Sequence, residues 1–225
     1  MCGRITLTTT DLAAWFGPFE GEPLPPSYNI APTQPVATLR LVEGRRVLAP
    51  MRWGLIPAWA QDLKKLPLLI NARADTVAEK PSFKHALRAR RCLVPADGFY
   101  EWRTEGKKKL PQYFRMNDGR PFALAGLWED WRDPEGAHVR SFTLITTEPN
   151  ELVAKIHDRM PVILPPDQHD RWLDPGLRDP AAILPLLRPY PAEAMTSWEV
   201  STRVNKAGED DPSLIEPGGQ LGLFG

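Results

Sequence analysis

Proline is the feature of this sequence that most constrains its fold. The chain has 25 prolines among 225 residues, against about 5 % of residues in an average protein. Proline has a fixed φ and no backbone N–H, so it interrupts helix interiors and is excluded from central strands. The content of hydrophobic residues, 42 %, still indicates a folded chain. We therefore predict an α+β fold: a single domain over residues 1–225 with a curved or barrel-like, mainly antiparallel sheet and several short helices.

Turn residues and hydrophobic periodicity divide the chain into short elements. Glu43-Gly44 predicts a hairpin turn. Arg91, at the end of the helix predicted over residues 81–91, is expected to face away from the packed side of that helix. Residues 207–225 are expected to form a flexible tail. The predicted strands are Arg4–Thr8, Val36–Val42, Arg46–Pro50, Cys92–Pro95, Gly98–Arg103, Gln112–Met116, Phe122–Trp131, Val139–Thr147 and Met195–Val200, and the predicted helices are Asp11–Phe16, Pro81–Arg91, Asn150–Ile156, Pro166–Leu173 and Pro180–Leu187.

Charge and metal-ligand content exclude several classes of protein. The 28 basic and 28 acidic residues balance, which excludes a bulk polycation but allows a local basic groove. Residues 84–115 carry nine basic and three acidic side chains, either as a solvated surface or as a surface that binds phosphates. Two cysteines, and four histidines without ligand spacing, predict no metal site, and no cofactor is expected.

The sequence has neither an apolar stretch of about 18 residues nor an apolar signal core behind its N-terminus, so no membrane helix or secretion signal is predicted. We therefore expect a cytoplasmic protein, associated with the nucleoid if bacterial, that is monomeric and has no membrane partner. In that compartment Cys2 and Cys92 stay reduced.

Cys2 is the most informative single residue. A methionine before a small side chain is commonly removed, which would leave Cys2 with an amine and a thiol on adjacent carbons. The amine titrates near ~7.7–8 and the thiol near ~8.5, so both are partly nucleophilic at neutral pH. The alternative is an incidental cysteine at a frayed terminus. The strand predicted from Arg4 favours a terminus that is held in place.

Three more polar residues stand beside apolar ones. Asn71 follows an apolar run, Glu101 lies among aromatic residues, and His157 follows Ile156. Each has a structural alternative: a turn-capping amide, a surface carboxylate on a half-exposed strand and a core histidine. Cys92 is interpreted as a buried strand thiol.

Several motifs, in order, resemble the family of SOS-response-associated peptidases (SRAP), whose members act on abasic sites in single-stranded DNA. The resemblance runs from residue 2 to about residue 205. It is carried by Met1-Cys2-Gly3-Arg4, Tyr28-Asn29-Ile30-Ala31-Pro32-Thr33, Arg52-Trp53-Gly54-Leu55-Ile56-Pro57, Asn71-Ala72-Arg73, residues 91–102 and His157-Asp158-Arg159-Met160-Pro161.

The resemblance implies that Cys2 forms a thiazolidine with the aldehyde of a ring-opened abasic sugar, protecting the site during the response to DNA damage. It implies catalytic roles for Cys2, Asn71, Glu101 and His157, with Glu101 as general acid–base and His157 as second proton-transfer group. It also implies limited self-removal of Met1. The implied contacts to DNA are Arg4, Asn29, Pro32, Trp53, Arg73, Trp102 and Arg159.

Two other functions remain open from the residues themselves. An N-terminal cysteine can be the nucleophile of a peptidase or amidohydrolase that uses its own amine as base. A module that binds single-stranded nucleic acid without covalent chemistry would account for the basic segment. It would not account for a fixed Cys2 together with the three polar residues.

Overall fold

The computed structural model of the protein describes residues 2–61, 63–132, 135–136 and 138–218. Its strands are β1 (Ile5–Leu7), β2 (Ser27–Ile30), β3 (Pro35–Val42), β4 (Arg45–Trp53), β5 (Asn71–Arg73), β6 (Arg91–Ala96), β7 (Gly98–Glu105), β8 (Lys108–Met116), β9 (Phe122–Arg132), β10 (His138–Thr147), β11 (Met160–Pro161), β12 (Ile163–Leu164) and β13 (Met195–Glu199). Its helices are α1 (Ala13–Phe16), α2 (Lys84–Ala89), α3 (His169–Leu173) and α4 (Pro180–Ile183). Single 3₁₀ turns cover Leu63–Lys65, Val153–Lys155, Pro166–Gln168, Leu184–Leu186, Ala192–Ala194, Thr202–Asn205 and Pro212–Ile215.

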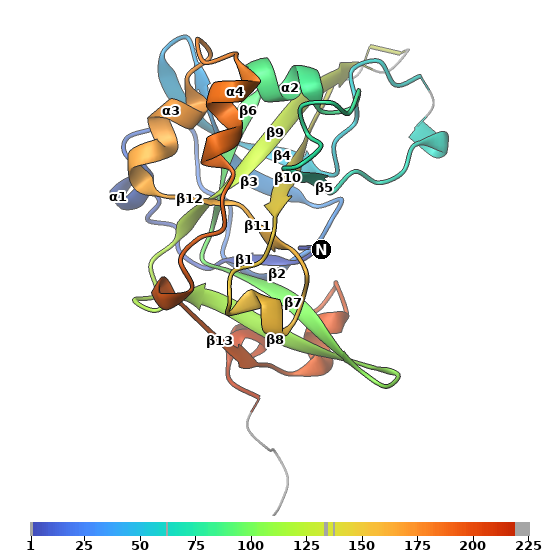
Figure 1. Cartoon of the computed structure of the whole chain (residues 1–225), viewed down its shortest axis with the longest axis vertical. Helices are drawn as coiled ribbons and strands as arrows, with labels where there is room; N and C mark the ends of the chain where they lie inside the picture. The colour runs from blue at the N-terminus through green and yellow to red at the C-terminus, as the bar shows by residue number, and fades with distance from the viewer. Residues whose placement is uncertain (1, 62, 133–134, 137, 219–225) are drawn as a thin grey trace, which may run out of the picture.

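The larger of two sheets closes into a barrel. Strands β10, β4, β3, β6 and β9 follow one another around it, and β9 pairs with β10 again. Among the strand pairings of the described residues, those of β10 with β4 and with β5 are parallel and the others are antiparallel. Figure 1 shows this barrel above a second sheet, with α2, α3 and α4 gathered at its upper end. The curved, mainly antiparallel architecture with short helices confirms the predicted fold class.

The second sheet has the strand order β13-β8-β7-β1-β2 and shares a hydrophobic core with the barrel. The chain crosses from one sheet to the other at Asp97, between the end of β6 and the start of β7. The buried Asp97 carboxylate accepts hydrogen bonds from Thr6 Oγ1 at 2.5 Å and from Thr8 N at 2.5 Å. This crossing point therefore holds the N-terminal strand against β7.

The helix predicted over residues 81–91 is shorter and spans Lys84–Ala89. The prediction that Arg91 faces solvent is wrong, because β6 already begins at this residue and turns its side chain inward. The Arg91 guanidinium donates to the carbonyls of Trp172 and Leu87 and lies 5.6 Å from the centre of the Trp172 ring. Arg91 thus belongs to the packing of α3 and not to a basic surface.

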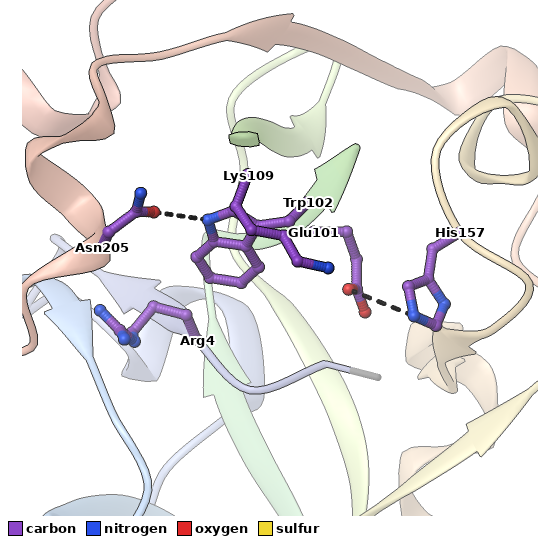
Figure 2. A pocket seen from close by; sticks show the side chains of 6 residues that line it. All are labelled: Arg4, Glu101, Trp102, Lys109, His157 and Asn205. Carbon is purple, nitrogen blue, oxygen red and sulfur yellow. Dashed lines mark hydrogen bonds and ion pairs between the residues drawn. The ribbon is translucent and has the colours of Figure 1, made fainter. Parts of the chain in front are cut away.

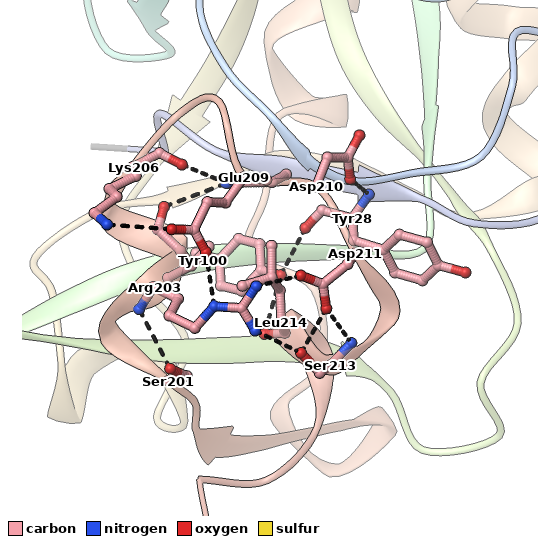
Figure 3. A network of polar contacts seen from close by, with 12 residues as sticks. Tyr28, Tyr100, Ser201, Arg203, Lys206, Glu209, Asp210, Asp211, Ser213 and Leu214 are labelled. Atoms are coloured by element: carbon pink, nitrogen blue, oxygen red, sulfur yellow. Dashed lines mark hydrogen bonds and ion pairs between the residues drawn. The ribbon is translucent and has the colours of Figure 1, made fainter.

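The expected flexible tail is packed against the second sheet as far as Gly218. Figure 3 shows its polar network, in which Asp210 accepts from the backbone N–H of Tyr28 and Arg203 pairs with Glu209 and Asp211. Leu214 is fully buried beside Tyr100. The acidic residues that suggested a solvated tail are used to hold this segment. Residues 219–225 lie outside the described residues.

Within the described ranges, no helix is long and apolar enough to cross a membrane.

The crossing point predicts a strong effect of a single methyl group. A Cβ atom at Gly98 would lie 2.2 Å from the Tyr113 hydroxyl and 2.3 Å from its ring. Since overpacking of a filled core costs about 1–3 kcal/mol, Gly98→Ala should lower the free energy of unfolding by at least that amount in urea denaturation. Gly208→Ala, where no atom lies within 4 Å, is the control. Equal midpoints for the two variants would contradict this account.

Candidate active site

Cys2 is held in place although it lies next to the chain terminus. Its side chain is fully buried, and its carbonyl accepts a hydrogen bond from Asn71 Nδ2 at 2.8 Å. The next residues are fixed by β7, because Tyr100 N donates to the carbonyl of Arg4 at 3.0 Å and Ile5 pairs with Phe99. The end of the chain at Cys2 is therefore ordered and not frayed.

Asn71 reaches Cys2 because β5 lies along β10, with Asn71 opposite Leu144 in the parallel register. A three-residue strand is sufficient here, since Leu144 N also donates to the carbonyl of Ile70. The amide thus contacts the backbone of the candidate nucleophile and caps no turn of its own.

Glu101 is buried, with 1 % of its surface exposed, so the interpretation as a surface carboxylate is wrong. Burial raises the pKa of this carboxyl to about 7, because removal from water disfavours the charged form. The charge of Glu101 in turn raises the pKa of the Cys2 thiol, after the larger effect of that thiol's own burial. The carboxyl and the thiol therefore lie close enough to influence each other.

His157 lies after the Val153–Lys155 turn and faces Glu101. Its Nε2 is 4.0 Å from Glu101 Oε2, and its Nδ1 accepts from the backbone N–H of Arg159 at 3.0 Å. Partial burial lowers the pKa of the imidazole, and Asp158 Oδ1 lies 2.9 Å from the same Nδ1. The arrangement is a carboxyl–imidazole pair in which burial raises the pKa of the carboxyl and lowers the pKa of the imidazole.

This pair forms one wall of a cavity of about 480 Å³, lined by Arg4, Glu101, Trp102, Lys109, His157 and Asn205. Figure 2 shows Arg4 and Trp102 on one side of it and Glu101 with His157 on the other. Trp102 Nε1 donates to Asn205 Oδ1 at 2.6 Å, and Arg4 lies 5.9 Å from the Trp102 ring centre. The cavity thus combines cations, an aromatic face and an acid–base pair.

Lys109 and Asn205 were not singled out from the sequence. Lys109 is one of three consecutive lysines at the β7–β8 turn, and only the strand pairing of Thr104 with Lys109 turns it toward the cavity. Asn205 arrives from the C-terminal segment, far from Trp102 in the chain. The basic run from residue 84 was a signal for Lys109, and for Asn205 the signal was the resemblance of Val204-Asn205 to the closing strand of the family.

Two of the predicted DNA contacts are core residues. Trp53 is fully buried, donates from Nε1 to the carbonyl of Ile70 and packs at 6.1 Å on the Phe142 ring, so it cannot stack on a base. Asn29 is also buried; its amide accepts from Arg4 and donates to three carbonyls of the C-terminal segment. Its place is to position Arg4 rather than to meet a ligand.

The other predicted contacts are accessible to different degrees. Arg4 and Trp102 line the cavity, Arg73 is exposed and Arg159 is largely covered. Pro32 is partly exposed in the loop that follows β2. Cys92 is buried and packs in the barrel, as predicted. Among the described residues, no group of three or more histidine, cysteine or acidic side chains is arranged to hold a metal ion.

Fold and site together define a β-barrel protein with a cysteine near its N-terminus beside a cationic cavity. The profile of the family described as SOS response associated peptidase (SRAP) matches residues 1–207, and the chain belongs to this family. It is 46 % identical over 224 residues to the abasic site processing protein YoqW of Bacillus subtilis, covering 96 % of this chain and 99 % of that relative.

Two further relatives are similar over nearly their whole length. The abasic site processing protein YoaM of Bacillus subtilis is 41 % identical over 225 residues, with 96 % of this chain and 98 % of the relative covered. A crystal structure of a protein from Bacteroides thetaiotaomicron superposes with a TM-score of 0.85 at 30 % identity, covering 96 % of this chain and 99 % of the other. The family resemblance predicted from the sequence is thereby confirmed.

The raised pKa of Glu101 predicts a dependence of stability on pH. Its pKa is about 7 when folded, against an ordinary value of 4.5, so the folded state binds the proton more tightly than the unfolded state. The stability from this group is fully present below about pH 4.5 and is lost as the pH rises through about 7.

The free energy of unfolding of Glu101→Gln, relative to that of the parent, should therefore rise by about 3 kcal/mol between pH 4.5 and pH 8. Urea denaturation at each pH measures it. Glu105→Gln, at an exposed position of the same strand, should show no such gain. A difference in the free energy of unfolding between parent and Glu101→Gln that stays constant across this pH range would show that the pKa of Glu101 is not raised by folding.

Proposed function

We propose that this protein forms a covalent thiazolidine between Cys2 and an abasic site in single-stranded DNA, after Met1 has been removed. The observation that carries the proposal is the position of Cys2, whose backbone is held by Asn71 and whose thiol lies close to Glu101, which faces His157 in the wall of a cationic cavity. The names of the curated relatives, abasic site processing proteins, support the same substrate.

The first step is attack of an amine on an aldehyde. An abasic sugar opens to a free aldehyde at C1′, and the neutral α-amine of Cys2 adds to that carbon. The resulting carbinolamine loses its hydroxyl as water, so a C–O bond breaks and a C=N bond forms. Glu101 in its protonated form can supply the proton that the departing oxygen needs. A pKa of about 7 keeps part of it protonated at neutral pH.

The second step closes the ring. The Cys2 sulfur adds to the imine carbon, its proton leaves, and the imine nitrogen takes up a proton, giving a five-membered ring of N, Cα, Cβ, S and C1′. Burial keeps this thiol protonated, so a nearby base must accept its proton as the C–S bond forms. Either the Glu101 carboxylate or the neutral imidazole of His157 can accept this proton. Closure within one residue has the entropic advantage of a partner already in place.

The remaining residues bind and orient the DNA. Asn71 positions the Cys2 backbone, Arg4 and Lys109 are cations at the cavity, and Trp102 offers a ring on which a base can stack. Arg73 and Arg159 each lie two residues beyond a proposed catalytic residue, Asn71 and His157, and are suited to phosphates next to the reacting sugar.

Separating the two nucleophiles of Cys2 tests the chemistry. Cys2→Ser with Met1 removed should form an imine that borohydride traps on abasic single-stranded DNA, but no heat-stable adduct, because a hydroxyl is a far weaker nucleophile. A chain extended ahead of Cys2 should form neither product, because its amine is an amide. Cys92→Ala should behave as the parent. Intact mass confirms each terminus, and adducts are counted on denaturing gels.

A stable adduct with the extended chain would contradict the thiazolidine mechanism. Cleavage of amide bonds by the parent without any adduct would instead favour an N-terminal cysteine peptidase.

The acid–base pair gives a kinetic prediction. Glu101→Gln should slow adduct formation by about 10²–10⁴-fold, the usual contribution of a positioned acid or base, while binding to intact single-stranded DNA changes little. His157→Ala should slow formation or reversal of the adduct. Single-turnover rates at saturating DNA measure both effects, with Glu105→Gln as control. Parent rates in both variants would rule out the proton-transfer roles.

A further inference from the structure

Asp75 lies between Arg73 and Arg159 and has no part in the chemistry proposed above. Its Oδ1 accepts from Arg73 Nε at 3.1 Å and its Oδ2 from Arg73 Nη2 at 2.5 Å, a two-point contact. The same Oδ2 lies 3.7 Å from Arg159 Nη1. One carboxylate thus faces two guanidinium groups that come from different parts of the chain.

Strand β10 brings these two arginines together. Thr146 lies opposite Arg73 of β5 on one side and opposite Pro161 of β11 on the other. The carbonyl of Thr146 accepts both from Ala74 N at 2.8 Å and from Arg159 Nη2 at 3.0 Å. Arg73 and Arg159 are therefore both held against strand β10, and the Asp75 carboxylate joins the ends of their side chains.

The contact does little to stabilise the fold. The side chains of Arg73 and Asp75 are 60 % and 49 % exposed, and ion pairs in water contribute little to stability. A carboxylate between two guanidinium groups offers two oxygens of the same charge sign as the free oxygens of a phosphodiester, and the guanidinium fork fits both groups.

We propose that Asp75 is a specificity-determining residue that stands in for a phosphate at Arg73 and Arg159 and competes with the DNA backbone for them. Intact single-stranded DNA must displace this carboxylate each time it binds, and its affinity is therefore low. A strand that also places its sugar at Cys2 is retained by the covalent step. This inference rests on the proposed function, since it takes single-stranded DNA as the ligand.

The test compares Asp75→Asn with the parent for binding of intact single-stranded DNA, by fluorescence anisotropy over a salt series. Freeing one arginine for one more phosphate should make the slope of log K against log salt more negative by about 0.7. The ratio of the variant's affinity to the parent's affinity should then be about fivefold larger at 50 mM salt than at 500 mM salt. In an Arg73→Gln background, Asp75→Asn should lose most of this gain.

Asp118→Asn is the matched control, because Asp118 is also an exposed acid paired with an arginine, Arg120, but in the turn after β8. It removes the same charge and should change the slope little. An Asp75→Asn slope equal to that of Asp118→Asn, or weaker binding than the parent, would overturn the inference. Parent protein that binds no single-stranded DNA would count against the proposed function as well. Parent protein that binds intact single-stranded DNA but forms no adduct with abasic single-stranded DNA would count against the covalent chemistry alone.

Discussion

The site depends on the pairing of β1 with β7. Chain ends usually fray because few contacts hold them, yet a reaction at the N-terminal residue needs that residue in one place. Here the second residue is buried, and the strand that follows is held by the Asp97 carboxylate and by the backbone of Tyr100. The chain crosses between the two sheets at that same acid, so the barrel, the second sheet and the terminus share one anchor.

Burial of Glu101 is the second physical condition of the site. A carboxyl removed from water resists ionisation, which brings its pKa to about 7 and makes the group able to give and take protons at neutral pH. The imidazole of His157 is shifted in the opposite direction by the same cause. The desolvation that costs stability also supplies the acid–base capacity.

The cationic groups around the cavity are arranged by elements distant in sequence. Arg4 is aligned by Asn29 and by the carbonyl of Val204 in the C-terminal segment, and Trp102 is fixed by Asn205. The segment predicted as a flexible tail, residues 207–225, supports the cavity indirectly, because its Glu209 carbonyl accepts from the Asn29 amide that aligns Arg4. The carboxylates of Glu209 and Asp211 pair with Arg203.

Sequence reasoning succeeded where chemistry or period-two patterning is local. The strand at Val139–Thr147, the Glu43-Gly44 turn, and the unusual polar residues Asn71, Glu101 and His157 were all recognisable from neighbours in the chain. It failed for Trp53 and Arg91, because a tryptophan or an arginine can serve equally on a surface or in a core. Only the packing of Trp53 on Phe142 and of Arg91 on Trp172 distinguishes the two.

By itself the sequence determined that this chain forms short strands rather than long helices, because its prolines deny backbone N–H groups to regular elements. It also determined the family, through ordered motifs, and it pointed to the residues whose catalytic roles we propose. Only the tertiary structure decided that Asn71 reaches Cys2, that Glu101 loses its water, and that Asp75 joins Arg73 to Arg159. These facts depend on the register of β5, β7 and β11 against their partners, and register between distant strands is set by the packing of the whole core.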